Sequence, residues 1–312
     1  MFQSCVSKIT SHEKKYSNAC DADFDEIDSH KNLDASSLRH LSYRNISAKL
    51  LENMFQTHIG IDYSGRGVSS TRTPTIQVYQ SKDHGDPKVV TSPACTAGRH
   101  RNWCRVEVAE WLSEQIRLEK RFIAGVDHGF SLPVSYMERF GLSNWEDFLQ
   151  DFCQHWPTHQ PEVSVDDVRK HLAKKRGRIG QANEYRLTER WTSSAKSVFQ
   201  FDVQGSVAKS THAGIPWLRE LRNEARDSLH FWPFDGWSIP EGKSVIAEIF
   251  PSIFRQRYPR DDRSVDAQDA YGVARWLSEA DQNDQLQHFF YPLLTQPQRE
   301  LAILEGWILG IM

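Results

Sequence analysis

The chain has 312 residues, of which 39% are hydrophobic and 25% charged, so its length suits one large domain or two modest ones. Its 38 Lys and Arg are balanced by 41 Asp and Glu, and this net charge of −3 excludes a polybasic binder of the histone type. No apolar run reaches the roughly 20 residues of a membrane helix. The five cysteines are scattered and never have C-x-x-C spacing, which favours a reducing compartment. We therefore expect a cytoplasmic globular protein.

The first 53 residues differ in composition from the rest of the chain. They are rich in Ser, Asp, His and Asn, with an acidic cluster from Asp21 to Asp28, and only residues 37–52 show some helical periodicity. Such a segment buries too little apolar surface to offset the entropy of ordering. We expect residues 1–53 to form a disordered or weakly helical extension, and residues 54–312 to form the folded domain.

Four strands and one helix are predicted in the first part of that domain. Residues 57–62 (THIGID) form an apolar run that ends in an acid, as in a buried strand before a turn. Strands over 74–80 and 88–90 flank the turn sequence HGDP and favour a hairpin. An apolar stripe then predicts a helix over 102–118, and 121–127 (RFIAGVD) is apolar enough for a strand covered on both faces.

A long segment, 128–243, interrupts this pattern with mixed helical and loop signals, including helical periodicity over 205–223. The final strand is expected over 244–250, and helices over 266–277 and 298–307 follow it. This order predicts an α/β fold with a mixed five-stranded sheet flanked by helices. A large, mainly helical insertion precedes the last strand.

Acidic residues stand where the carboxyl ends of neighbouring strands are expected. Asp62 ends the first strand, Asp127 ends the fourth, and Asp266 and Asp269 lie one turn apart on the later helix. Clustered carboxylates repel one another unless a divalent cation neutralises them, and oxygen ligands select Mg²⁺ or Mn²⁺. Each acid taken singly also suits a turn or a helix cap, but their joint placement favours a metal site.

Glu248, within the final strand, is a fifth candidate. It shares a face of that strand with Ile246 and Phe250, where an ionised side chain is costly without a cation or an ion-pair partner. Two interpretations stay open: Glu248 contributes to the metal site, or it pairs with an arginine, which we favour over direct metal binding.

Four segments in this order, HIGIDYSG, FIAGVDHGFSLP, VIAEIFPS and DAQDAYGVARWL, resemble a domain-of-unknown-function family of predicted nucleases in the ribonuclease H-like superfamily. The segments GIPWLRELR and EGWILGI also fit that family, so the resemblance extends from residue 54 to the C-terminus. DAQDA before an apolar helix is similar to the closing catalytic helix of bacterial Holliday-junction resolvases. The resemblance implies a ribonuclease H-like fold, with Asp266 and Asp269 as metal ligands and Asp62 as the central one.

Residues 169–178 (RKHLAKKRGR) are the candidate surface for nucleic acid, because seven of the ten are Arg, Lys or His. Such a patch holds phosphates by charge and by release of counterions. A solvated helix face is the alternative interpretation. The cations concerned are Arg169, Lys170, Lys174, Lys175, Arg176 and Arg178.

Three hypotheses for function follow. In the first, Asp62, Asp127 and Asp269 bind Mg²⁺ or Mn²⁺, Asp266 and Glu248 assist, and a metal-activated water hydrolyses a phosphodiester of DNA or RNA, leaving a 3′-hydroxyl and a 5′-phosphate as the resemblance implies. In the second, a non-catalytic nucleic-acid or protein-binding module keeps the fold, and binding ignores EDTA. In the third, IGIDYSG resembles the first strand of actin-like phosphotransferases, but the duplicated sheet of that group is not evident here.

Overall fold

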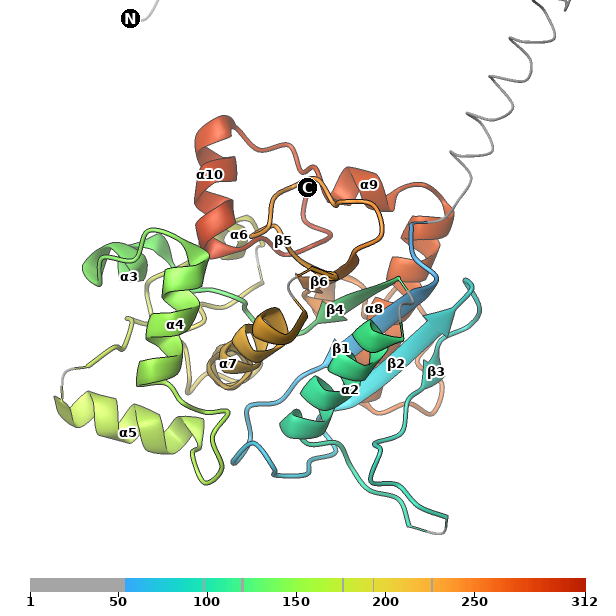
Figure 1. The fold of residues 1–312 in the computed structure, drawn as a ribbon, viewed down its shortest axis with the longest axis horizontal. Coiled ribbons are helices and arrows are strands. Elements are labelled where there is room, and N and C mark those ends of the chain that lie inside the picture. The colour runs from blue at the N-terminus through green and yellow to red at the C-terminus, as the bar shows by residue number, and fades with distance from the viewer. Residues whose placement is uncertain (1–53, 98, 119–120, 176, 193, 226) are drawn as a thin grey trace, which may run out of the picture. The chain divides into compact units, whose positions relative to one another are not determined.

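The structure is a computed structural model that describes residues 54–312 apart from residues 98, 119–120, 176, 193 and 226. The predicted extension over 1–53 lies outside the described residues. The rest is an α/β fold in which helices flank a mixed sheet, as predicted (Figure 1). In the part of the chain that the structure describes, no helix is both long and apolar enough to cross a membrane.

One sheet of six strands forms the centre of the fold: β1 (Thr57–Asp62), β2 (Gln77–Lys82), β3 (Lys88–Val89), β4 (Phe122–Val126), β5 (Leu229–Trp232) and β6 (Ser244–Glu248). The strand order is β3-β2-β1-β4-β6-β5. β2 is antiparallel to β1 and β3, whereas β1, β4, β6 and β5 are parallel to one another. Every residue of these four parallel strands is buried, which explains their apolar runs, because a strand covered on both faces needs no polar alternation.

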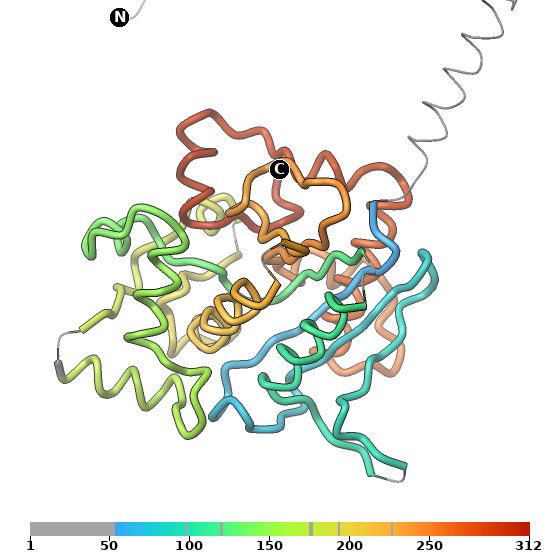
Figure 2. Tube along the Cα trace, in the orientation of Figure 1, coloured from blue at the N-terminus to red at the C-terminus, as the bar shows by residue number. Residues whose placement is uncertain are grey.

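Helices cover both faces of the sheet. They are α2 (Arg105–Arg117), α3 (Val134–Arg139), α4 (Trp145–His155), α5 (Val165–Lys175), α6 (Leu187–Trp191), α7 (Ala208–Ala225), α8 (Val265–Gln282), α9 (Leu286–Phe289) and α10 (Gln296–Glu305), with a 3₁₀ turn, η1 (Pro251–Ile253). Ile59 and Ile61 of β1 belong to the core cluster shared with α2 and α7, in front of the sheet in Figures 1 and 2. Ile123 and Val245 pack with Val273 of α8 in a second cluster, behind it.

The sheet has one strand more than predicted. β5 lies inside the segment 128–243 that was expected to be mainly helical, and it pairs in parallel with β6 at the edge of the sheet. Its four residues (LHFW) are too short a run to show strand periodicity, and the aromatic residues that follow hide its end. The long helical segment predicted after the fourth strand is confirmed between β4 and β5.

Gly60, in the middle of β1, allows α8 to lie directly against the sheet. A Cβ atom at this position would lie 2.1 Å from the carbonyl oxygen of Ala270 and 2.7 Å from the backbone nitrogen of Ala274. Backbone atoms of a packed helix cannot turn aside as a flexible side chain can, so a side chain at residue 60 would push α8 away from β1.

We therefore expect Gly60→Ala to lower the free energy of unfolding by about 3 kcal/mol. Urea denaturation of the variant and the parent chain measures this loss. Gly85→Ala is the control, because the nearest atom to a Cβ at residue 85 would be 3.1 Å away. Its free energy of unfolding should differ from that of the parent by no more than about 1 kcal/mol. Equal unfolding midpoints for Gly60→Ala and the parent would contradict the close contact.

Candidate active site

Two of the predicted acids lie side by side at the carboxyl ends of neighbouring parallel strands. Asp62 is the last residue of β1, and Asp127 directly follows β4. The backbone amide of Asp127 donates a hydrogen bond to the carbonyl of Ile61 at 2.9 Å, which continues the strand pairing as far as the two acids. The carboxyl of Asp62, only 8% exposed, donates a further hydrogen bond to the carboxylate of Asp127.

The first turns of α8 supply two more acids. Ser264 caps this helix by accepting a hydrogen bond from a backbone amide of the first turn at 3.1 Å, so the helix begins just before the acids. Asp266 is half-buried and Asp269 is buried. The charges of both act on Asp62 at the end of β1. The structure therefore brings Asp62, Asp127, Asp266 and Asp269 together from three separate elements.

The crowding of these acids changes their protonation. Burial raises the pKa of Asp62 well above its usual value, and the charges of Asp127, Asp266 and Asp269 raise it further. Burial also raises the pKa of Asp127 to about 7, although the hydrogen bond from Asp62 acts in the opposite direction. Burial and the charge of Asp269 raise the pKa of Asp266. Near neutral pH the metal-free cluster therefore retains protons that a bound cation would displace.

An arginine that the sequence analysis did not single out neutralises part of this cluster. Arg255 follows η1, and its guanidinium donates from Nε to Oδ1 of Asp269 at 2.8 Å and from Nη2 to Oδ2 at 2.5 Å. The hydrogen bonds to Asp269 raise the pKa of Arg255, and the charges of Asp127 and Asp62 raise it further. Arg255 lies in an irregular segment, where no periodicity or motif marks a side chain as part of a site.

Glu248, the fifth predicted site residue, lies in β6 and has both carboxylate oxygens bound by an arginine. Nη1 and Nη2 of Arg186 each donate to Glu248 at 2.6 Å, and both side chains are almost fully buried. Oε2 of Glu248 also accepts from the backbone amide of Phe130 at 3.1 Å, and Arg186 donates from Nε to Glu189 at 2.8 Å. The expected arginine partner is confirmed, and metal binding by Glu248 would require this ion pair to break.

The predicted nucleic-acid surface lies on α5 and in the loop after it. Arg169 pairs with Asp202, and Arg178 pairs with Asp151 at 2.7 Å, so acids of the same chain neutralise part of its charge. The remaining predicted residues are Lys170 and Lys174, which are exposed, Lys175, which ends α5, and Arg176, which lies outside the described residues. This surface therefore keeps fewer free cations than its sequence suggests.

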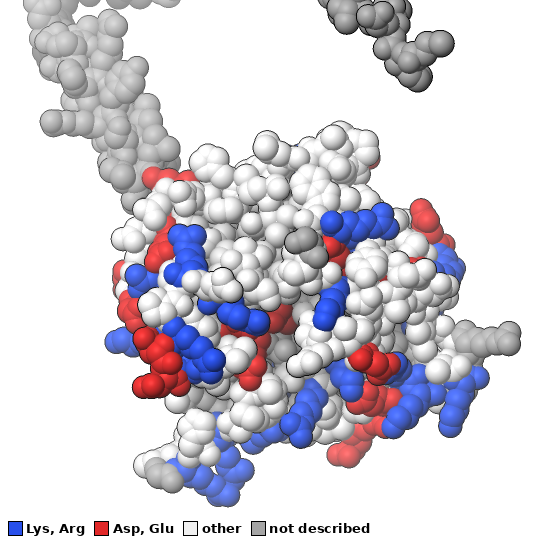
Figure 3. All heavy atoms as spheres, turned by 180° about the vertical axis from the view of Figure 1, so that it is seen from behind, with Lys and Arg blue, Asp and Glu red and all other residues white. Residues whose placement is uncertain are grey.

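Acidic and basic side chains also gather around the face seen in Figure 3. Acidic side chains lie near the middle of this face, with Lys and Arg side chains on either side of them. A small cavity of about 20 Å³, room for about one water molecule, adjoins Asp127, His128 and Lys196, and the Arg186–Glu248 ion pair forms another part of its wall. Lys196, which donates a hydrogen bond to the carbonyl of Gln204, is the lysine that lines this cavity.

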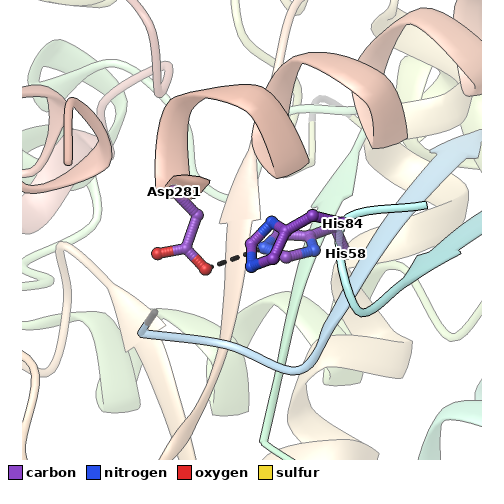
Figure 4. A group of neighbouring side chains, drawn as sticks. All are labelled: His58, His84 and Asp281. Atoms are coloured by element: carbon purple, nitrogen blue, oxygen red, sulfur yellow. Dashed lines mark hydrogen bonds and ion pairs between the residues drawn. The ribbon is translucent and has the colours of Figure 1, made fainter. Parts of the chain in front are cut away.

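A second group of metal-ligating side chains lies elsewhere in the fold (Figure 4). Within the described ranges, His58, His84 and Asp281 are the one set of three or more His, Cys, Asp or Glu whose ligand atoms all lie within 4.8 Å of one another. The predicted acids do not meet this distance criterion as a set of three, and both oxygens of Asp269 are bound by Arg255. The sequence analysis missed the histidine group because its members are far apart in the chain and match no ligand spacing.

Comparisons of the chain with protein-family models, with curated proteins and with solved structures give no match. The ribonuclease H-like assignment therefore remains a proposal carried by the sequence motifs. The six-stranded α/β fold rests on the structure itself.

Proposed function

We propose that this protein is a metal-dependent nuclease of ribonuclease H-like fold, which hydrolyses phosphodiester bonds with Mg²⁺ or Mn²⁺ held by Asp62, Asp127 and Asp269. The observation that carries the proposal is the convergence of four carboxyl groups from β1, β4 and α8 at the carboxyl ends of two parallel strands. In open α/β sheets, ligands bind at this edge.

The chemistry of the donor set fits a hard divalent cation. All candidate ligands are carboxylate oxygens, which Mg²⁺ and Mn²⁺ prefer over nitrogen and sulfur. Without a cation, the repulsion inside the cluster is relieved by a proton on Asp62 and by the guanidinium of Arg255. A metal ion would replace both of these positive charges, and this supports a cation site at the cluster.

When bound, the metal lowers the pKa of a water ligand and neutralises charge on the phosphate. The residues of this chain have distinct parts in the reaction. Asp62, Asp127 and Asp269 would hold the metal, and Asp266, which is half-buried at the margin of the cluster, is suited to accept a proton from water. Lys196, which lines the same small cavity as Asp127, would have to leave the carbonyl of Gln204 to bind a phosphate oxygen at the mouth of the site.

The proposal is tested by incubating the purified chain with labelled single-stranded and double-stranded DNA and RNA in the presence of Mn²⁺ or EDTA. We expect cleavage that requires the metal and yields 5′-phosphate ends. Anomalous scattering from crystals soaked in Mn²⁺ should place the ion at Asp62. Nucleic-acid binding that is unaffected by EDTA, without cleavage, would instead support a non-catalytic binding module.

The affinity of the acid cluster for Mn²⁺ should rise with pH across neutrality. The pKa of Asp127 is raised to about 7, so below that pH the metal must displace a proton, at a cost of roughly tenfold in affinity per pH unit. The same shift makes the metal-free fold less stable as pH rises from about 4 to about 7, because the native state then binds more protons than the unfolded chain. Calorimetric Mn²⁺ titrations at pH 6, 7 and 8 check the first trend, and a pH-independent affinity would contradict it.

Arg255→Gln should tighten Mn²⁺ binding to the cluster. This change frees both oxygens of Asp269. Because the Arg255 side chain is 47% exposed, its ion pair contributes about 1 kcal/mol, so its loss should raise the affinity for Mn²⁺ roughly fivefold. Arg257→Gln is the matched control, since Arg257 pairs with Glu279 instead. Titration at pH 8 compares the two variants, and equal affinities would show that Arg255 does not compete with the metal.

A further inference from the structure

The far ends of β1 and α8 carry a second cluster, separate from the acids. His58 is the second residue of β1, and Asp281 lies in the last turn of α8. His84 comes from the turn between β2 and β3 (Figure 4). His58 and Asp62 are four residues apart on one strand, about 13 Å, so the two clusters lie at opposite ends of β1.

The hydrogen bonds of this cluster orient its nitrogen and oxygen atoms toward one another. Nε2 of His58 lies 2.9 Å from Oδ2 of Asp281, and the rings of His58 and His84 are 4.9 Å apart between centroids. Nδ1 of His84 lies 3.0 Å from the carbonyl oxygen of Ser278, which can only accept, so Nδ1 carries the proton and Nε2 keeps a lone pair. Metal-binding histidines are commonly held in this way, with one ring nitrogen donating to a carbonyl and the other facing the metal.

One ring nitrogen of this cluster has no partner within the described part of the protein. Nδ1 of His58 has no hydrogen-bond partner in the described structure, and His58 is 0% exposed, so solvent does not reach this nitrogen either. Asp281 accepts from the backbone amides of Met54 and Phe55 at 2.9 and 3.0 Å, which fixes its carboxylate in place.

We propose that His58, His84 and Asp281 form a binding site for a zinc-type transition-metal ion, with a fourth position open to water. Two imidazole nitrogens and one carboxylate oxygen are a ligand set that Zn²⁺ accepts, whereas Mg²⁺ avoids nitrogen. The ligand atoms lie within 4.8 Å of one another, and four-coordinate zinc needs separations of about 3.3 Å. His84 is half-buried on the turn between β2 and β3, so its side chain can move to shorten the distances between the ligand atoms. An ion would enter the site past this residue.

Such an ion would join the hairpin, the start of β1 and the end of α8. It would act as a clamp on the β1–α8 contact that also positions the acids, but its binding requires neither the acids nor nuclease activity. The inference therefore stands or falls independently of the proposed function.

The test is titration of the metal-stripped full chain with Zn²⁺, followed by calorimetry, by thermal unfolding and by the visible absorption of Co²⁺ as a substitute. We expect a site with a dissociation constant in the micromolar range or tighter, and a rise of several degrees in the unfolding midpoint. His84→Ala should weaken binding by about 100-fold, while the His58–Asp281 hydrogen bond, and with it the fold, is retained.

Two control variants separate this site from other zinc-binding groups. His288→Ala removes an exposed histidine outside the cluster, and Asp62→Asn disables the acid cluster; both should bind Zn²⁺ as the parent chain does. The proposal is overturned if His84→Ala binds Zn²⁺ as tightly as the parent, if Asp62→Asn rather than His84→Ala loses the ion, or if the parent chain itself binds none.

Discussion

Asp62→Asn is expected to abolish Mn²⁺-dependent cleavage, with a loss of at least about 10³-fold, and at the same time to stabilise the metal-free protein. The amide carries no negative charge for a cation, so the central ligand of the proposed site is lost. It can still donate a hydrogen bond to Asp127, as the protonated Asp62 does, so the local geometry is kept. Burial and the charges of its neighbours raise the pKa of Asp62, so the folded parent retains a proton there that the unfolded chain releases as the pH rises, and the variant avoids this loss of stability.

The gain in stability should be about 1–2 kcal/mol at pH 8 and should shrink toward pH 5. Because the folded pKa of Asp62 is raised, the parent chain loses stability relative to the variant as the pH rises, so the two chains differ more at pH 8 than at pH 5. Urea denaturation in EDTA at the two pH values measures this difference, and single-turnover cleavage at saturating Mn²⁺ measures the activity.

Asp262→Asn is the control, because Asp262 is an exposed acid just before α8. It should change neither the stability nor the cleavage rate appreciably. Retained cleavage by Asp62→Asn would refute the metal role of Asp62. A variant that is inactive and also less stable than the parent at pH 8 would show that Asp62 acts in packing rather than as a strained ligand.

The convergence of the acids could be predicted from the sequence because each lies at the end of a strongly patterned element. β1 and β4 are apolar runs that end in or just before an acid, and a helical crossover between two strands makes them parallel neighbours. Asp266 and Asp269 share a helix whose apolar stripe was evident. In each case periodicity located the element, and topology then brought the acids together.

The partners of the charged side chains could not be predicted in this way. Arg186 and Glu248 are 62 residues apart, and Arg255 reaches Asp269 from an irregular segment. Long-range pairing depends on which loops return to the sheet, and no local pattern encodes it. For the same reason the basic run on α5 did not reveal that Arg169 is paired with an acid.

Arg186→Ala is expected to lower the free energy of unfolding by about 4 kcal/mol, the largest stability loss we predict for a single polar side chain. Arg186 is 1% exposed and binds Glu248 and Glu189, which are themselves buried. Burial lowers the pKa of Arg186, but the two glutamates outweigh it and raise the pKa overall. Removal of the guanidinium leaves both carboxylates buried without their cation, and that desolvated charge accounts for most of the cost.

The matched control is Arg190→Ala, since Arg190 lies one turn further along and is exposed, so its loss should stay within about 0.5 kcal/mol. A double variant, Arg186→Met with Glu248→Met, should be less destabilised than Arg186→Ala, because an apolar pair leaves a single uncompensated charge on Glu189 in place of two. Urea denaturation of the four chains gives the comparison. If Arg186→Ala unfolds at the same midpoint as Arg190→Ala, the ion pair does not hold β6 against the α6 region, and Glu248 would be free to turn toward Asp127 and a bound metal.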